Sequence, residues 1–230
     1  MRTRHLPVFA AVLAVVGLVA GCTGSPSEEG PDPATLLEES SETTKGQTSA
    51  HLELAVEGQI AGLPVESLEG DLTLIPEVAA TGTGDMMMLG QRLEAVEFVV
   101  SGGDMWVALT PGGGLSNLGP ASAVYDVASI LDPDVGLANV LANFSDPKAD
   151  GTETVQGVDT VRITGNVSAD AVNKICPPIR ATDPVPGTVW IAEDGDHELV
   201  QARLEPGSDS SLTMTMSKWG EPVTINTPAG

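Results

Sequence analysis

The sequence is poor in aromatic residues and in positive charge. Phe, Trp and Tyr make up only 3% of the 230 residues, and 10 Lys and Arg stand against 32 Asp and Glu. The formal net charge of −22 argues against partners such as nucleic acids or anionic lipid headgroups, because both attract clusters of basic side chains. An acidic surface that simply keeps the protein in solution is an equally simple explanation of this charge.

Cysteine and histidine are also scarce, which limits the chemistry that the chain can perform. If Cys22 carries a lipid, as argued below, Cys176 has no disulfide partner, and a small buried thiol is its simplest interpretation. His5, His51 and His197 lie far apart and lack the spacing of a zinc motif. The sequence contains no Walker loop and no Gly-x-Ser-x-Gly elbow. We therefore expect no metal, no cofactor and no catalytic residues, although a dispersed catalytic pair stays open.

Only one long apolar run is present, and it lies at the start of the sequence. Arg2 and Arg4 precede an apolar stretch over residues 7–20, which is too short to span a bilayer comfortably and has the length of a signal-peptide core. It ends in VAGC at residues 19–22, the pattern of a bacterial lipobox. We expect residues 1–21 to be a signal peptide and Cys22 to be acylated. An ordinary signal peptide with an accidental cysteine is the alternative.

These features predict the location of the protein and its division into segments. A lipid on Cys22 would hold the protein on the extracytoplasmic face of the cell membrane, and a secreted pool is a further expectation. Residues 22–32 are rich in Ser, Gly, Pro and Glu and are typical of a flexible tether. Residues 33–230 then form one domain, which we expect to be a monomer.

Period-two patterns predict that most of this domain is antiparallel β-sheet. Leu52, Leu54 and Val56 alternate with polar or small residues, as do the residues from 67 to 74. Further strands are expected over residues 79–89, 92–100, 105–110, 188–193, 198–204 and 212–217, around residues 155–163, and around 223–225 at the end. Gly102-Gly103 and Asp194-Gly195 are typical of hairpin turns, and residues 111–120 of a long glycine-rich loop.

Three helices are predicted from caps and periodicity. Asp32-Pro33 begins a helix that ends near Gly46, since Asp is a good N-cap and Pro is accepted at the first helical position. Asp132-Pro133 predicts a second helix, whose apolar stripe is Leu137, Val140, Leu141 and Phe144. Ser168 can cap a short third helix over residues 169–175.

The expected fold class is α+β, with a single curled antiparallel sheet of about ten strands. Such a large sheet tends to curl into a half-barrel, and the helices are the available cover for its concave face. Small residues such as Gly70, Gly82 and Ala95 on the strands would leave room for an apolar cavity between helices and sheet. Composition alone favours a packed core over a cavity.

Several stretches of the domain resemble the LprG/LppX-type lipoproteins of mycobacteria, the LprG branch most of all. They are residues 70–73 (GDLT), 98–100 (FVV), 125–126 (YD), 132–134 (DPD), 136–144 (GLANVLANF), 184–186 (PVP), 188–191 (TVWI) and 217–221 (SKWGE). The resemblance implies a half-barrel sheet covered by helices around a large apolar cavity. It also implies binding of acylated glycolipids, such as lipoarabinomannan and phosphatidylinositol mannosides, and of triacylglycerol, beside a major-facilitator efflux transporter.

With this resemblance, the cavity is favoured over the packed core, and we expect the protein to be a lipid carrier. The predicted lining residues lie on two strands and on the second helix: Met86, Met88, Val96, Phe98, Val100, Leu137, Val140, Leu141 and Phe144. A structural or chaperone lipoprotein that assists a transporter and binds lipid only weakly is the alternative, and a lipid hydrolase comes third. The loop at residues 111–120 and the MMM at 86–88 depart from the family pattern, which leaves the exact ligand and the entrance open.

Overall fold

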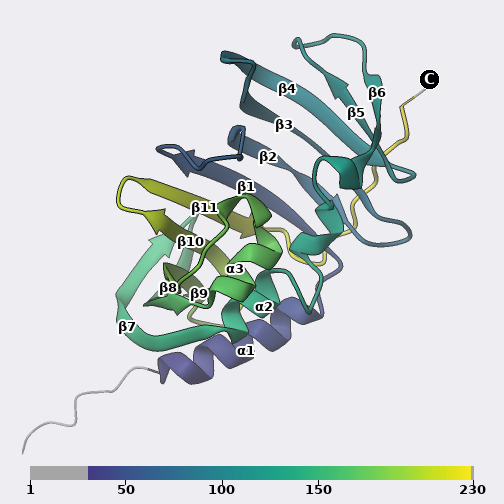
Figure 1. Ribbon diagram of the computed structural model, residues 1–230. Coiled ribbons are helices and arrows are strands. Elements are labelled where there is room, and N and C mark those ends of the chain that lie inside the picture. Colours follow the sequence, from purple (N-terminus) through teal and green to yellow (C-terminus); the bar gives the residue numbers. More distant parts are fainter. Residues whose placement is uncertain (1–30, 229–230) are drawn as a thin grey trace, which may run out of the picture.

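Alternating apolar and polar residues fold residues 31–228, the part of the chain that the structure describes, into one antiparallel sheet of eleven strands (Figure 1). The structure is a computed structural model. The strands are β1 (Ser49–Glu57), β2 (Val65–Thr73), β3 (Ala79–Met88), β4 (Gln91–Ser101), β5 (Asp104–Ala108), β6 (Ser116–Pro120), β7 (Phe144–Val155), β8 (Val158–Val167), β9 (Val185–Ala192), β10 (Leu199–Gly207) and β11 (Ser210–Ser217). The predicted α+β class is confirmed, with one strand more than expected.

Two meanders make up the sheet, and they meet in its middle. The strand order is β6-β5-β4-β3-β2-β1-β11-β10-β9-β8-β7, so every neighbour is consecutive in the chain except the pair β1–β11. In that pair Leu52 lies opposite Met216, and Leu54 lies opposite Met214. The first and last strands therefore join the two halves of the sheet.

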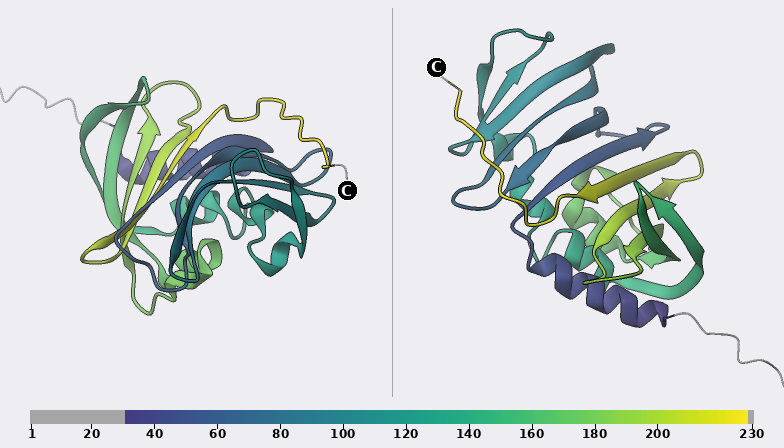
Figure 2. Two further views of the ribbon diagram at one scale, coloured as in Figure 1. Left: turned by 90° about the horizontal axis from the view of Figure 1, so that it is seen from above. Right: turned by 180° about the vertical axis from the view of Figure 1, so that it is seen from behind.

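The helices are α1 (Pro33–Lys45), α2 (Leu137–Ala142) and α3 (Ala169–Ile175), with 3-10 turns η1 (Ala121–Ala123), η2 (Val127–Ile130) and η3 (Pro177–Ile179). α1 precedes β1, while η1, η2 and α2 connect β6 to β7, and α3 and η3 connect β8 to β9. Figure 2 shows the helices inside the curl of the sheet, so they cover its concave face.

Helix α1 forms as its caps predict. The Asp32 carboxylate accepts a hydrogen bond from the Ala34 amide at 3.2 Å, and Gly46 ends the helix. Leu36 and Leu37 are buried in the core, and the Ser41 hydroxyl donates to the Ala138 carbonyl oxygen of α2 at 2.9 Å. The apolar side of α1 therefore packs against α2. The two helices together cover one end of the half-barrel, at the bottom of Figure 1.

Glycines let neighbouring strands approach closely where the sheet curls. A Cβ at Gly70 would lie 2.3 Å from the Thr81 carbonyl oxygen, and a Cβ at Gly82 would lie 2.2 Å from that of Glu69. Both distances are far below van der Waals contact with backbone atoms that cannot move independently. Glycine at these positions permits the sharp bend between β2 and β3.

The second helix differs from the prediction at both ends. Its N-cap is Gly136, because the Asp132 carboxylate accepts from the amides of Asp134 and Val135 and holds a separate turn before the helix. The helix ends at Ala142, so Phe144 is the first residue of β7 and does not belong to the helical stripe.

Other differences lie at the edges of the sheet. Residues 116–120 of the predicted loop form the edge strand β6, and β7 begins at residue 144, well before the expected strand. The predicted strand around residues 223–225 is absent from the described chain, where residues 221–228 have no regular structure. This segment runs across the ends of the central strands (Figure 2). The hydroxyls of Ser101 and Thr227 are hydrogen-bonded at 2.6 Å.

The predicted signal peptide, the acylated Cys22 and most of the tether lie outside the described residues. Within residues 31–228, no helix has the length and apolar character that crossing a bilayer requires.

Candidate functional site

The concave face of β1–β4 is an apolar surface with a glycine floor. Antiparallel register places its residues in two rows across the four strands. The rows are Leu52, Gly70, Gly82 and Phe98, and Leu54, Leu68, Gly84 and Val96. Because the central positions of the first row have no side chains, the Phe98 ring lies over Gly82, with its Cε1 2.9 Å from where a Cβ would stand. The side chains of this face are therefore shortest at the two central strands, and all of them are apolar.

Six of the nine predicted lining residues come together in one hydrophobic cluster. Val100, Leu137, Val140 and Leu141 are buried in it, and Phe98 and Phe144 are partly buried against it. The three α2 side chains fill the space between helix and sheet, so their present role is core packing. The pattern Val96, Phe98, Val100 does share one face of β4, as its alternation predicts.

The other three predicted residues lie outside this cluster. Val96 is buried, with 1% of its surface exposed, and Met86 is half-buried. Met88 is 41% exposed and lies at the end of the β3–β4 hairpin. A lining role for all nine residues stays a prediction.

Sequence reasoning missed several apolar side chains that retain exposed surface on this face. Leu54, Leu68 and Met105 are partly buried against the core, from β1, β2 and β5 respectively. The period-two alternation of Leu54 and Leu68 had already placed them on the apolar side of their strands. The signal was therefore present, and only the neighbouring strands in the sheet were unknown.

A tyrosine connects the turns over the concave face to helix α3. The Tyr125 hydroxyl donates to the Ile175 carbonyl oxygen at 2.9 Å and accepts from the Ser129 hydroxyl at 3.0 Å. Burial raises the pKa of Tyr125, so the phenol stays protonated and able to donate. These bonds fix the segment around η1 and η2 against the C-terminal end of α3, above the apolar face.

Sequence comparison places this geometry in a known group. The model of the LppX_LprAFG lipoprotein family matches residues 32–225. The chain belongs to this lipoprotein family. It is 54% identical over 96% of its length to a protein of Mycolicibacterium smegmatis named lipoarabinomannan carrier protein LprG, covering 95% of that protein. It is 49% identical to the protein of the same name in Mycobacterium tuberculosis H37Rv, over 98% of this chain and 95% of the relative.

Solved structures of LppX_LprAFG lipoproteins share the architecture. Crystal structures of LprF from Mycobacterium bovis and of the lipoprotein LppX from Mycobacterium tuberculosis superpose with TM-scores of 0.79 and 0.65. Their sequences are 31% and 33% identical to this chain, and the alignments cover 87% and 85% of it, and 98% and 100% of the two relatives. The curled sheet with helices over its concave face is thus the fold of this family.

In this family member, Cys176 is a buried thiol at the end of α3. Burial raises the pKa of the Cys176 thiol to about 11, against a weaker, lowering effect of the Ile179 backbone amide. Only the thiolate is a good nucleophile, and the folded protein holds almost none at neutral pH. The buried-thiol interpretation agrees with this position.

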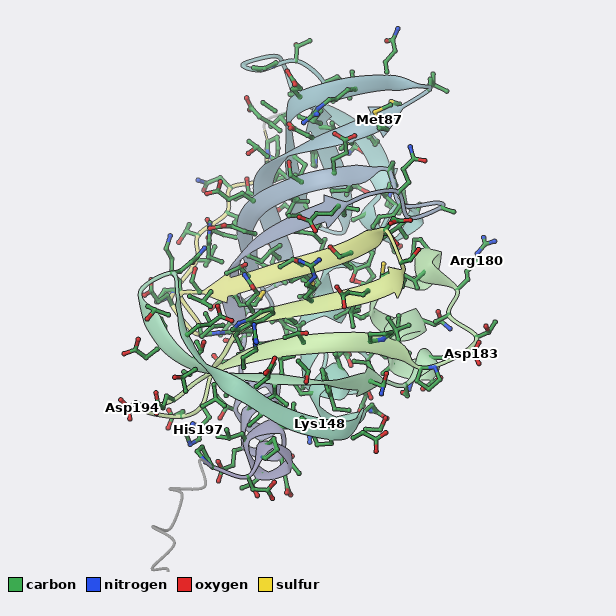
Figure 3. The ribbon with its side chains drawn as sticks, turned by 90° about the vertical axis from the view of Figure 1, so that its left-hand side faces the viewer. Met87, Lys148, Arg180, Asp183, Asp194 and His197 are labelled. Atoms are coloured by element: carbon green, nitrogen blue, oxygen red, sulfur yellow. The ribbon has the colours of Figure 1, made fainter. Side chains whose placement is uncertain are left out.

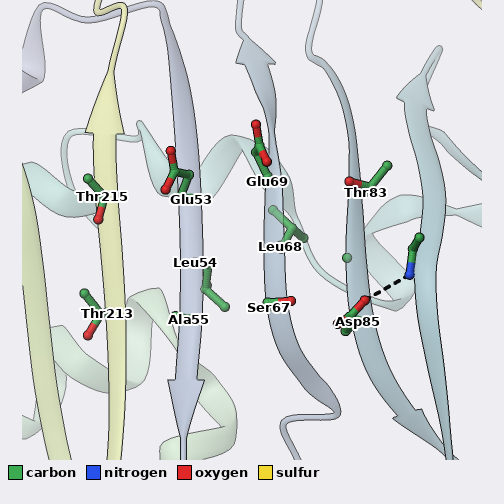
Figure 4. A pocket seen from close by; sticks show the side chains of 12 residues that line it. Glu53, Leu54, Ala55, Ser67, Leu68, Glu69, Thr83, Asp85, Thr213 and Thr215 are labelled. Atoms are coloured by element: carbon green, nitrogen blue, oxygen red, sulfur yellow. Dashed lines mark hydrogen bonds between the residues drawn. The ribbon is translucent and has the colours of Figure 1, made fainter. Parts of the chain in front are cut away.

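The convex face of this lipoprotein fold is polar. A hollow of about 380 Å³ lies across β11, β1, β2 and β3 (Figure 4). Most of its walls are side chains that alternate with the apolar rows, among them Glu53, Glu69, Thr83 and Thr213, and its lining also reaches Leu54 and Leu68. The hollow is mainly polar, so it does not match the predicted apolar cavity between helices and sheet, which stays a prediction. Residues 31–228 contain no group of three or more His, Cys, Asp or Glu side chains arranged to hold a metal ion.

Proposed function

We propose that this protein is a membrane-anchored, non-enzymatic carrier of acylated lipids. The observation that carries the proposal is the partly exposed apolar face formed by Leu54, Leu68 and Phe98 beneath the helices. The relatives named lipoarabinomannan carriers support it, because they match nearly the whole chain at about half identity. A triacylated glycolipid, such as lipoarabinomannan or a phosphatidylinositol mannoside, is the proposed cargo, and triacylglycerol is a second one.

The physical basis of binding is removal of acyl chains from water. Each buried methylene contributes about 0.8 kcal/mol, so two or three long chains bind tightly with few polar contacts. A polar glycan would stay in water at the edge of the sheet. The proposed partner is a major-facilitator efflux transporter, the protein acts as a monomer, and acylation at Cys22 holds it on the extracytoplasmic side of the membrane.

Binding requires that the apolar face can accept chains, which mutation can test. Leu68 is partly exposed on the face, whereas Leu141 is fully buried in the core. Leu68→Trp should abolish copurification of lipid, observed by native mass spectrometry, with little change in the free energy of unfolding. Leu141→Trp, the matched control, should destabilise the protein by about 1–3 kcal/mol or more, because it overpacks a filled site.

The same samples distinguish carriage from hydrolysis. A labelled triacylated glycolipid should move between vesicles with its ester bonds intact and without added metal or nucleotide. Release of free fatty acid in proportion to protein, abolished by a single substitution, would replace the carrier with a hydrolase. Absence of copurifying lipid from the unmodified protein, together with failure to bind added lipid, would favour a structural role beside the transporter.

A further inference from the structure

The β3–β4 hairpin ends in an uncharged, apolar tip. Residues 86–91 read MMMLGQ, a run without charge in a chain that has 42 charged residues. Met87 and Met88 are each 41% exposed, and Leu89 is 100% exposed. No other large apolar side chain among residues 31–228 is so fully exposed, so this tip displays apolar surface that the fold itself does not use.

Besides its exposure to water, Leu89 has an unfavourable backbone conformation. Leu89 has a φ of +50° and precedes Gly90 at +77°. Two-residue hairpin turns with two positive φ values favour Asn-Gly, because asparagine and glycine tolerate the left-handed region and leucine does not. Leucine at position 89 is therefore unfavourable for the backbone and for solvation. The solvation cost disappears if the side chain enters an apolar environment outside the folded chain, whereas the backbone cost remains.

Ion pairs and a side-chain–backbone hydrogen bond connect the two strands at the base of the hairpin. Arg92 forms ion pairs with Asp85 at 2.9 Å, with Glu66 at 3.2 Å and with Glu94 at 3.5 Å. The Ala95 amide donates to the Asp85 carboxylate at 2.9 Å, at the irregularity that turns the strand end. Arg92, the cation at the base of the hairpin, is thus already paired with carboxylates of this chain.

The hairpin tip lies far from the predicted membrane anchor. Figure 1 shows the β3–β4 hairpin at the opposite end of the molecule from the start of α1, where the tether begins. Figure 3 shows Met87 likewise far from Asp194 and His197, which lie beside the tether end. Leu109, exposed at the end of β5, lies at the same end of the sheet as the tip.

We propose that the β3–β4 hairpin tip, Met87–Met88–Leu89, inserts into the apolar layer of a lipid surface with uncharged or zwitterionic headgroups. This inference goes beyond the proposed function, since it concerns where the carrier touches a membrane and not what it carries. A tip of three side chains is too small for a stable protein interface, which needs about 800 Å² on each partner. Lipid insertion needs no such area, because each apolar side chain partitions on its own.

Charge decides which lipid surface is suitable. The chain carries a formal net charge of −22, so an anionic surface would repel the body as the tip approached. Unbranched methionine side chains adapt to a fluid apolar environment. Binding should therefore be stronger to neutral vesicles than to anionic ones, and high salt should not weaken binding to the neutral vesicles.

Vesicle flotation tests the proposal with a chain that begins at residue 23, which retains every helix and strand described and lacks the predicted acyl anchor. Vesicles of phosphatidylcholine alone are compared with vesicles that also contain phosphatidylglycerol. Leu89→Asn should lower the partition coefficient by roughly 10- to 100-fold, the expected loss for removing one leucine from an apolar phase. Its midpoint of thermal unfolding should be unchanged or higher, because asparagine suits the turn.

The matched control is Leu118→Asn, which removes a leucine that is 59% exposed on β6, outside the hairpin. This control should float like the unmodified chain. Equal loss in both variants, or unchanged flotation of Leu89→Asn, would overturn the proposal, and so would binding that disappears in high salt. If Leu89→Asn floats like the unmodified chain but no longer cross-links to another protein in membranes, the tip binds a protein partner and not lipid. Lipid copurification should persist in Leu89→Asn, which separates this test from that of the carrier function.

Discussion

Replacement of Gly82 by alanine tests whether the close approach of β2 and β3 shapes the concave face. The added Cβ would lie 2.2 Å from the Glu69 carbonyl oxygen and 2.9 Å from both Gly70 Cα and Phe98 Cε1. The ring can move, but the backbone of the paired strand cannot move without opening the bend. We expect Gly82→Ala to lower the free energy of unfolding by about 1–3 kcal/mol, as overpacking of a filled interior does.

Gly114→Ala is the control, because no atom lies within 4 Å of the position of its Cβ and its φ is not positive. That change should be neutral or stabilising by about 0.4–1 kcal/mol, since alanine restricts the unfolded chain. Urea unfolding of the two variants gives the comparison, and thermal midpoints should differ by roughly 2–4 °C for each kcal/mol in a domain of this size. Equal stability of both variants would show that the glycine floor is not needed for strand approach, and the explanation of the bend would be wrong.

Three further predictions concern individual side chains. Cys22→Ala combined with Leu89→Asn, which removes both proposed membrane contacts, should release the protein from the membrane fraction, and retention of this double variant at high salt would contradict acylation at Cys22. Tyr125→Phe should lower the free energy of unfolding by about 1–2 kcal/mol in urea titrations, because it removes the bonds to Ile175 and Ser129. Burial raises the pKa of the Cys176 thiol from 9.0 in an exposed reference to about 11, so the unfolded chain loses this proton first and the free energy of unfolding falls as pH rises above 9.0. Cys176→Ala should remove that part of the alkaline destabilisation, and an unchanged pH profile would show that the thiol does not contribute.

The sequence predicted the parts of the fold that depend on local patterns. The caps of α1 and α3 and the alternation in β1, β2 and β11 needed only neighbouring residues, and the structure contains all of them. Strand β7 was missed because both of its faces are largely exposed and polar, so it has no apolar alternation. The start of α2 was placed too early because Asp132 caps a turn as readily as a helix.

The candidate site depended on information that a single sequence does not contain. Alternation showed which residues of β4 share a face, but not that Gly70 and Gly82 lie beside them. Exposure likewise depends on what the helices cover. Leu137 and Leu141 are fully covered, whereas Leu54 and Leu68 are not, although all four are leucines in regular apolar patterns.

The junction of β1 with β11 has a consequence for how the protein can be made. Strands β1 to β10 all leave the ribosome before β11, the strand that must pair with β1, has been made. Until β11 arrives, β1 presents an unpaired edge in the middle of the future sheet, which is a site for wrong pairing with another chain. Contacts between residues so distant in sequence also form slowly. Export as proposed above would therefore require the chain to stay unfolded until its last strand has passed, and we expect a chain stopped before residue 210 to aggregate.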